Sequence, residues 1–185
     1  MPGECLIRVL GISGSLREAS SNSALVRAAV RLAPPGIEVS AYGELADIPP
    51  FNPDLDIDVG PAAVSRFRAA LQSSDAILIS SPEYAHGVSG VLKNALDWVV
   101  SSGELIDKPI ALLNTSARAT HAHAALCETL TTMAGHVVRD ASITIPIGGT
   151  AFDADGNLTD ARASSSLTSA IEVLAHAVSH HRHSS

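Results

Sequence analysis

The chain alternates between two patterns of apolar residues. Short runs rich in Val, Ile and Leu, each bounded by turn residues, are typical of β-strands. Such runs predict five strands, at about residues 5–12, 37–42, 76–81, 109–114 and 137–145. The third and fourth runs are almost continuously apolar, which indicates strands that are buried on both faces of a sheet.

Between these runs, apolar residues recur at the three- and four-residue spacing of a helix. Five helices are predicted by the groups Leu25, Ala28, Ala29 and Leu32; Val64, Phe67 and Leu71; Leu92, Ala95, Leu96 and Val99; Leu126, Leu130 and Met133; and Leu167, Ala170, Ile171, Leu174 and Val178. Alternating strands and helices require parallel strands joined by crossover helices on both faces of the sheet. The expected fold class is therefore α/β, a doubly wound five-stranded parallel sheet.

Three segments fall outside this alternation. Residues 47–61, rich in proline and aspartate, predict a long irregular loop. Residues 151–161 predict a polar connector, and their DADG sequence indicates an ordinary turn because the ligand spacing of a calcium loop is incomplete. The histidines within 176–185 have no cysteine or carboxylate beside them, so a frayed tail is expected and no metal site is assigned.

The overall composition narrows the classes of protein to consider. The 185 residues fit a single domain, 1–185. A net charge of −7 and an aromatic content of 3% disfavour nucleic-acid binding, which rewards positive charge and stacking platforms. No apolar run approaches the roughly 18 residues of a membrane span, and residues 1–5 do not resemble a secretory signal, so a cytoplasmic location is expected. Cys5 and Cys127 predict buried, reduced thiols.

The segment GISGSLREASSNSAL, residues 11–25, gathers small hydroxyls around one positive charge after the first strand. At a strand-to-helix turn, free N–H groups at the helix start favour an anion. Gly14 allows a close approach, serine hydroxyls donate to oxygen, Arg17 supplies charge, and Asn22 caps the helix or donates to the ligand. The loop therefore predicts a phosphate site, and a serine-rich cap without a ligand is the alternative. Neither G-x-x-x-x-G-K-[ST] nor G-x-G-x-x-G occurs here, which disfavours a nucleoside triphosphatase and an ordinary dinucleotide-binding domain.

A second unusual loop, residues 81–90 with the sequence SPEYAHGVSG, follows the third strand. In a sheet of order 2-1-3-4-5, strands 1 and 3 flank the switch point, and ligands bind at their carboxyl ends. Both loops are expected at that point.

These residues resemble the NAD(P)H-dependent FMN reductases, a family of flavodoxin-like fold that includes quinone, azo-dye and chromate reductases. The family pattern G-S-L-R-x-x-S-x-N is met by the segment from Gly14 to Asn22, and most of P-E-Y-N-x-x-x-P-G-x-L-K-N-A-[IL]-D-W is met by residues 82–98. With the order of strands and helices, the resemblance covers about residues 5–150. It implies a flavodoxin-like sheet of order 2-1-3-4-5 that binds FMN.

The resemblance also implies which residues surround the cofactor. The FMN phosphate would be held by Ser15, Arg17, Ser20 and Asn22, with help from Ser13 and Ser23, and the isoalloxazine pocket would be shaped by Pro82, Glu83 and Tyr84, with residue 85 contributing a backbone contact and His86 a polar group. On the other side of the flavin, Thr115 and Ser116 would contact the ring and Arg118 would meet a phosphate of the nicotinamide cofactor, although the same residues would serve as an ordinary helix cap.

The chain departs from the family pattern at two positions. Ala85 stands where the family has asparagine, and Ser89 where it has proline. An amide hydrogen bond to the flavin is lost at residue 85, whereas a backbone contact can persist. Lys93, Asn94, Asp97 and Trp98 match the pattern but lie in a predicted helix, so packing, contact with neighbouring loops or a subunit interface is expected of them.

The function implied is an FMN-dependent oxidoreductase. NADPH or NADH would reduce the flavin, and a quinone, free flavin, azo compound or similar small acceptor would reoxidise it. No catalytic side chain is named, because the flavin carries the chemistry, and no G-x-S-x-G elbow or hydrolytic triad is present. A non-enzymatic flavin-binding electron carrier or sensor is the alternative, and a member that has lost its cofactor is a further one. Like family members, the chain is expected to form a homodimer or homotetramer, and neither the acceptor nor the preferred nicotinamide follows from the sequence.

Overall fold

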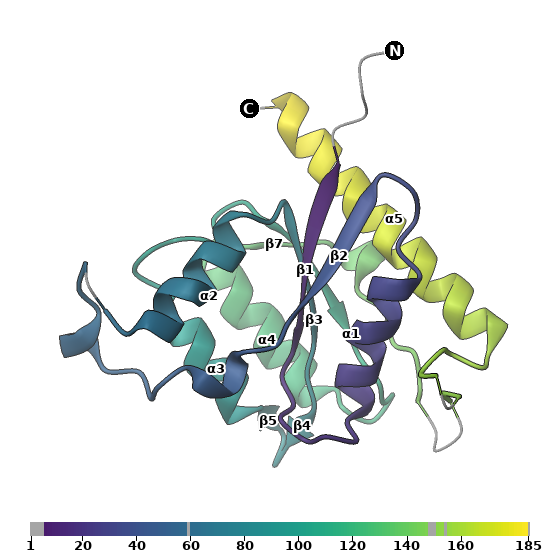
Figure 1. Cartoon of the computed structure of the whole chain (residues 1–185), viewed down its shortest axis with the longest axis horizontal. Helices are drawn as coiled ribbons and strands as arrows, with labels where there is room; N and C mark the ends of the chain where they lie inside the picture. The colour runs from purple at the N-terminus through teal and green to yellow at the C-terminus, as the bar shows by residue number, and fades with distance from the viewer. Residues whose placement is uncertain (1–5, 59, 148–150, 154, 185) are drawn as a thin grey trace.

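Five parallel strands form the central sheet (Figure 1). The computed structural model describes residues 6–58, 60–147, 151–153 and 155–184. The strands are β1 (Ile7–Ser13), β2 (Ile37–Tyr42), β3 (Ala76–Ser80), β6 (Pro109–Leu113) and β7 (His136–Val137), paired in the order β2-β1-β3-β6-β7. Because β4 and β5 form a separate hairpin, this is the predicted order 2-1-3-4-5. The expected doubly wound flavodoxin-like fold is confirmed.

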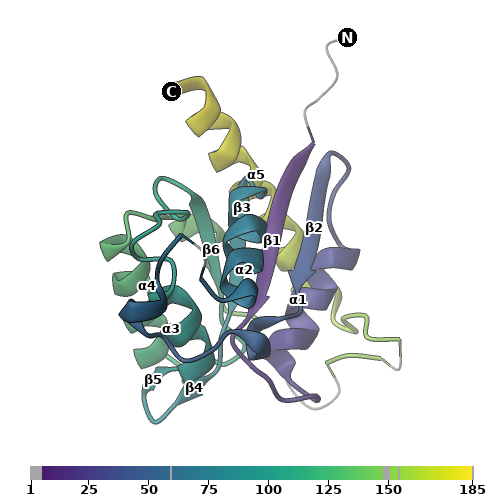
Figure 2. The ribbon, with the colours of Figure 1, turned by 60° about the vertical axis from the view of Figure 1, so that its left-hand side comes forward.

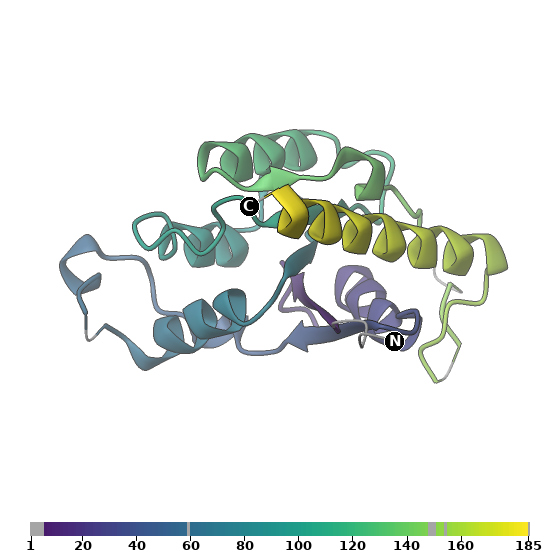
Figure 3. The ribbon, with the colours of Figure 1, turned by 90° about the horizontal axis from the view of Figure 1, so that it is seen from above.

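All five predicted helices are present. They are α1 (Ser21–Arg31), α2 (Ala62–Gln72), α3 (Gly90–Asp97), α4 (His121–Thr132) and α5 (Ala161–Ser184). Seen from above, α2 and α3 lie on one side of the sheet and α1 lies on the other (Figure 3). The strand side chains alternate accordingly: Ile77 and Ile79 pack with α2, α3 and α4, whereas Ala76 and Leu78 pack with α1 and α5. Helices on both faces explain why the strands are continuously apolar.

The last strand is shorter than predicted. A continuous strand over 137–145 is wrong, because a 3₁₀ turn, η3 (Arg139–Ala141), interrupts it. The Oγ of Ser142 accepts the N–H of Leu112 at 3.0 Å, where a backbone carbonyl would continue the ladder. Pairing resumes as an isolated bridge at Thr144. A serine side chain therefore replaces part of the expected β-ladder.

The C-terminal segment is helical rather than frayed. The expectation of a frayed tail is wrong for residues 176–184, which belong to α5. Val178 is 3% exposed and continues the apolar stripe of the helix, and Arg182 forms a 2.6 Å ion pair with Asp75. Both contacts hold the helix against the sheet, as Figure 2 shows for its path behind β1 and β2. Among the described residues, no three His, Cys, Asp or Glu side chains converge as a metal site.

The loop over residues 47–61 is irregular, as predicted, apart from the short 3₁₀ turns η1 (Leu45–Asp47) and η2 (Pro53–Leu55). This loop is held by Asn94 in α3 and by Trp98 at the C-terminal end of that helix. The Nε1 of Trp98 donates to the carbonyl of Pro49 at 2.8 Å, and Asn94 donates to the same carbonyl at 2.9 Å and accepts the N–H of Phe51 at 2.7 Å. The expected packing role of these motif residues is confirmed.

Two sequence-based expectations concern compartment and thiols. No helix among the described residues has the length and apolar character needed to cross a membrane. The cytoplasmic location stays a prediction. Cys127 on α4 is a free, half-buried thiol, and Cys5 lies outside the described residues.

Candidate functional site

The carboxyl ends of β1 and β3 lie side by side at one edge of the sheet (Figure 1). Ser13 pairs with Ser80, and the next N–H, that of Gly14, donates to the carbonyl of Ser80 across 2.8 Å. In the sheet, β2 lies beside β1 on one side of this point, and β3 and then β6 lie on the other side. The two motif loops therefore meet at the topological switch point, where ligands bind in such sheets.

The serine-rich loop ends at the N-terminus of α1. Ser20 is the N-cap residue, and its Oγ accepts the N–H of Ser23 at 3.3 Å. Of the two roles predicted for Asn22, the capping role thus belongs to Ser20. Among the described residues, the N–H groups of Ser21 and Asn22 have no acceptor, as is usual for the first turn of a helix. Their partial positive charge favours an anion here.

The side chain of Asn22 is held by residues from two neighbouring strands. Its Oδ1 accepts a hydrogen bond from Ser80 at 2.9 Å and another from Thr115 at 3.4 Å. Ser80 is fully buried, and Asn22 is 6% exposed. With Oδ1 occupied by two hydroxyl donors, the amide Nδ2 is left with its hydrogens free for a further acceptor. Asn22 is therefore a buried, oriented donor at the start of α1.

Hydroxyl groups line the same loop. The Oγ atoms of Ser13 and Ser23 lie 2.8 Å apart, and Ser15 accepts the N–H of Arg17 at 3.3 Å. The guanidinium of Arg17 is exposed and has no hydrogen-bond or ion-pair partner among the described residues. The predicted phosphate-binding side chains are thus brought together around the start of α1, with a positive charge at their outer side.

Gly14 is required by the space around it. A Cβ at this position would lie 2.5 Å from the Oγ of Ser81 and 2.9 Å from the Oγ of Ser89. Such distances are far shorter than ordinary van der Waals contacts. The first and second motif loops are packed so closely that only a residue without a side chain fits between them.

The second motif loop is a two-stranded hairpin, β4 (Glu83–Tyr84) and β5 (Gly87–Val88), which the sequence did not predict. Ala85 and His86 form its turn with φ of 49° and 60°. Two consecutive positive φ values define a type I′ turn, which usually carries Asn or Gly. Because neither residue type stands at 85 or 86, the usual hairpin signal is absent from this sequence.

The hairpin is attached to the N-terminus of α4. The carboxylate of Glu83 accepts the N–H of Ala122 at 2.8 Å, so this negative charge compensates the free donors of the helix start. Tyr84 on the same strand is 56% exposed, at the outer edge of the site. Glu83 therefore fixes the hairpin against α4.

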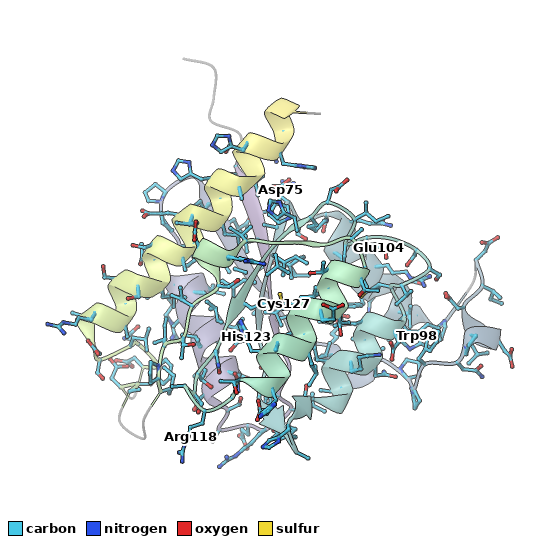
Figure 4. All side chains as sticks on the ribbon, turned by 180° about the vertical axis from the view of Figure 1, so that it is seen from behind. Asp75, Trp98, Glu104, Arg118, His123 and Cys127 are labelled. Carbon is cyan, nitrogen blue, oxygen red and sulfur yellow. The ribbon has the colours of Figure 1, made fainter. Side chains whose placement is uncertain are left out.

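The third loop follows β6 and is organised by Asn114, which is 7% exposed. Its Oδ1 accepts the N–H of Ser116 at 3.1 Å, and its Nδ2 donates to the carbonyl of Ala119 at 2.9 Å. Ser116 in turn accepts the N–H of Arg118, whose side chain extends away from the molecule (Figure 4). Ser80 and Asn114 hold other groups of the site in position, and neither was singled out from the sequence. Their signal was a polar residue at the carboxyl end of each apolar run.

A small cavity lies behind these loops, beneath the start of α4. It is lined by Ile79, Ser81, Leu112, Leu113, Asn114, Ala119, Ala122, His123 and Leu126. Burial lowers the pKa of His123 from its ordinary value, since the charged imidazole loses hydration there. Burial therefore favours the neutral form of His123, which Figure 4 shows on the α4 helix.

The three loops together fit an anionic phosphate group. The free N–H groups of α1, the amide of Asn22 and the exposed guanidinium of Arg17 are donors without a protein acceptor among the described residues. Gly14 permits the close approach of the Ser81 and Ser89 side chains to its backbone, which holds the first two loops together. Among the described residues, no carboxylate takes part in the hydrogen bonds of residues 13–23. The site therefore has the donor chemistry that a phosphate monoester needs.

Comparisons with known proteins agree with this site. Residues 7–150 match the family described as NADPH-dependent FMN reductase. The chain is 38% identical over 173 residues to an NAD(P)H-dependent FMN reductase of Pseudomonas aeruginosa, a match that covers 91% of this chain and 93% of that protein. It is 36% identical over 116 residues to a quinone reductase of Escherichia coli K12, which covers 60% of each protein.

A solved structure is similar over nearly the whole chain. FerB, a flavoenzyme NAD(P)H:(acceptor) oxidoreductase from Paracoccus denitrificans, superposes with a TM-score of 0.84 at 29% identity, covering 95% of this chain and 98% of FerB. The family match over residues 7–150 includes the sheet and all three loops at its carboxyl edge. The chain belongs to the NADPH-dependent FMN reductase family, and it is an oxidoreductase that uses FMN and NAD(P)H.

Proposed function

We propose that this protein oxidises NADPH or NADH and, through bound FMN, reduces a quinone. The observation that carries the cofactor assignment is the buried amide of Asn22 beside the free N–H groups of α1. The choice of a quinone is supported by the relative named quinone reductase. Free flavin and azo compounds are the other acceptors to be compared in the same assay.

The phosphate of FMN is assigned to the start of α1. There the N–H groups of Ser21 and Asn22 and the Nδ2 of Asn22 donate to its oxygens, and Arg17 closes the site from outside. Four serines line the same place and supply hydroxyl donors, namely Ser13, Ser15, Ser20 and Ser23. The start of the helix, the neutral donors and the single cation together suit a dianionic phosphate.

The isoalloxazine is assigned to the space between the hairpin and the third loop. Pro82, Glu83 and Tyr84 shape one side, with the backbone of Ala85 and the imidazole of His86 at its tip. Thr115 and Ser116 border the other side, and exposed Arg118 is placed to meet a phosphate of the nicotinamide cofactor. The antiparallel hairpin offers backbone groups to the polar edge of the ring.

FMN, when bound, would supply the redox chemistry that couples oxidation of NAD(P)H to reduction of the acceptor. The net reaction converts NAD(P)H, a proton and a quinone into NAD(P)⁺ and a hydroquinone. The residues of this chain bind and orient both substrates in turn, and none is assigned as a proton donor or nucleophile.

A homo-oligomer is part of the proposal. Exposed apolar side chains gather near the contact of Asp56 with Ser101, whose side chains lie 2.5 Å apart. Leu55 and Ile57 flank Asp56, and Val100 precedes Ser101, with exposed fractions of 46%, 59% and 61%. An exposed apolar surface of this kind supports association with a second copy of the chain. The mass of the purified protein in solution tests this directly.

The first experiment is the visible spectrum of the protein after loading with FMN and desalting, followed by anaerobic addition of NADPH or NADH. Retained flavin that bleaches and is restored by a quinone supports the proposal. Retained flavin that neither nucleotide reduces identifies an electron carrier or sensor instead. Arg17→Ala should weaken FMN binding about 10- to 100-fold, as expected for a lost charged hydrogen bond. Arg27→Ala, on the exposed side of α1, is the matched control and should bind as the wild type does.

A further inference from the structure

Two histidines are stacked at the junction of the hairpin and α4. The ring centroids of His86 and His121 lie 4.2 Å apart, and the ring planes differ by 14°. His86 is in the turn of the hairpin, and His121 is the first residue of α4. Both side chains are exposed, so water and protons reach them freely. The contact joins two of the three loops that border the proposed flavin site.

The hairpin depends on contacts of this kind for its position. Each of its strands has two residues, and its turn places Ala85 and His86 at positive φ, which costs energy for residues other than glycine. An isolated two-stranded hairpin is at best marginally stable. The hydrogen bond from Ala122 to Glu83 and the stack of His86 on His121 attach it to α4 at two successive residues of the helix.

We propose that the imidazole pair of His86 and His121 positions the hairpin for FMN binding, and that the second proton taken up by the pair releases the hairpin in acid. The inference rests on the proposed function, because it assigns the ring of FMN to this hairpin. One imidazolium can stack on a neutral imidazole, since the ring face attracts a cation. Two positive charges at this separation repel each other.

The surroundings of the pair oppose a second positive charge, above all at His121. His121 lies at the N-terminal end of α4, whose partial positive charge disfavours a cation. Glu83 on the hairpin carries the nearby negative charge, but its Oε2 is bound to the N–H of Ala122. Arg118 and His123 are the other basic side chains close in sequence on the α4 side, and Tyr84 is the remaining titratable group of the hairpin. Histidine side chains ordinarily change charge between about pH 5 and 8, and this range sets the two pH values of the test.

The test compares FMN affinity at about pH 8 and about pH 5.5 in variants that keep or remove the stack. At about pH 8, His86→Ala should weaken FMN binding about two- to tenfold, and His86→Phe should restore it because an aromatic ring is retained. The FMN phosphate itself titrates near pH 6, so the wild type is judged against the double variant His86→Phe/His121→Phe. We expect the wild type to lose about fivefold more affinity in acid than this double variant. His136→Phe, on β7 at the opposite edge of the sheet, is the matched control and should follow the wild type.

A second measurement follows the imidazole NMR signals in the protein without flavin. The two rings should titrate as a coupled pair, and His86→Phe should move the midpoint of His121 to higher pH because the competing charge is gone. An unchanged midpoint overturns the proposal, and so does an acid loss of FMN affinity that is equal in the wild type and the double variant. Failure to bind FMN at about pH 8 would count against the proposed function instead, since the NMR titration tests the pair by itself.

Discussion

The hydroxyl of Ser80 donates to the Oδ1 of Asn22 across 2.9 Å and joins the end of β3 to the first turn of α1. Both side chains are almost completely buried, so this hydrogen bond is shielded from water. Because Oδ1 is the acceptor here, the orientation of the amide is determined and its Nδ2 is the group available to a ligand. Ser80 therefore acts on the proposed phosphate site through Asn22.

We expect Ser80→Ala to weaken FMN binding about two- to tenfold, because the free energy of one buried hydrogen bond corresponds to an affinity change of that size. Riboflavin lacks the phosphate, so its affinity should stay within about twofold of the wild-type value. When Ser80→Ala is combined with Asn22→Ala, the losses of FMN binding free energy should be less than additive, because both substitutions remove the same hydrogen bond. Fluorescence titration of both flavins measures this. Ser74→Ala is the control, a buried serine that bonds the carbonyl of Leu71 at 2.8 Å, and equal losses for FMN and riboflavin would contradict the assignment.

Gly14→Ala tests the close packing of the first two loops. The added methyl group would meet Ser81 at 2.5 Å, so the loops must move apart and the donors around Asn22 lose their arrangement. We expect a loss of about 1–3 kcal/mol in the free energy of unfolding and weaker FMN retention on desalting. Gly43→Ala is the matched control, because no atom lies within 4 Å of the added group. Equal behaviour of the two variants would show that Gly14 is not needed for space.

Ala85→Asn tests the cost of the strained turn. Ala85 has a φ of 49°, where asparagine is more easily accommodated than alanine. The substitution should raise the free energy of unfolding by about 0.5–1 kcal/mol, and it also restores the amide that the family carries here. Ala134→Asn, at a φ of 58° away from the site, should stabilise similarly and leave FMN affinity unchanged. If the Ala134 variant also bound FMN more tightly, a gain in FMN affinity by the Ala85 variant would be explained by its stability alone.

His123 makes the stability of the fold depend on pH. Burial lowers its pKa from an ordinary value of 6.5, so the unfolded chain binds this proton at a higher pH than the folded protein does. The free energy of unfolding should therefore fall as the pH decreases from 6.5 towards the lowered folded-state pKa. Urea unfolding at several pH values measures the slope. In His123→Gln the slope should be smaller, whereas exposed His136→Gln should leave it unchanged.

The strands and helices were predictable because their signals are local. Buried parallel strands need continuous apolar runs, and covering helices need a periodic stripe, so the pattern of residues 76–80 or 25–32 determines the element by itself. The last strand was predicted too long because the Oγ of Ser142 replaces a backbone acceptor for Leu112, 30 residues away. The helix end at 176–184 was missed because its ion pair joins Arg182 to Asp75, 107 residues away.

By itself, the sequence determined the fold class, the order of the elements and the two loops that carry the family pattern, since these depend on residue type and spacing. The tertiary structure decided that Ser20 caps α1 and that Ser80 and Thr115 hold Asn22, from 58 and 93 residues away. It also decided that Ala85 and His86 form the turn of a hairpin that contacts α4, although neither residue favours a positive φ. Hydrogen bonds between distant residues, and strain offset by neighbouring contacts, leave no periodic trace along the chain.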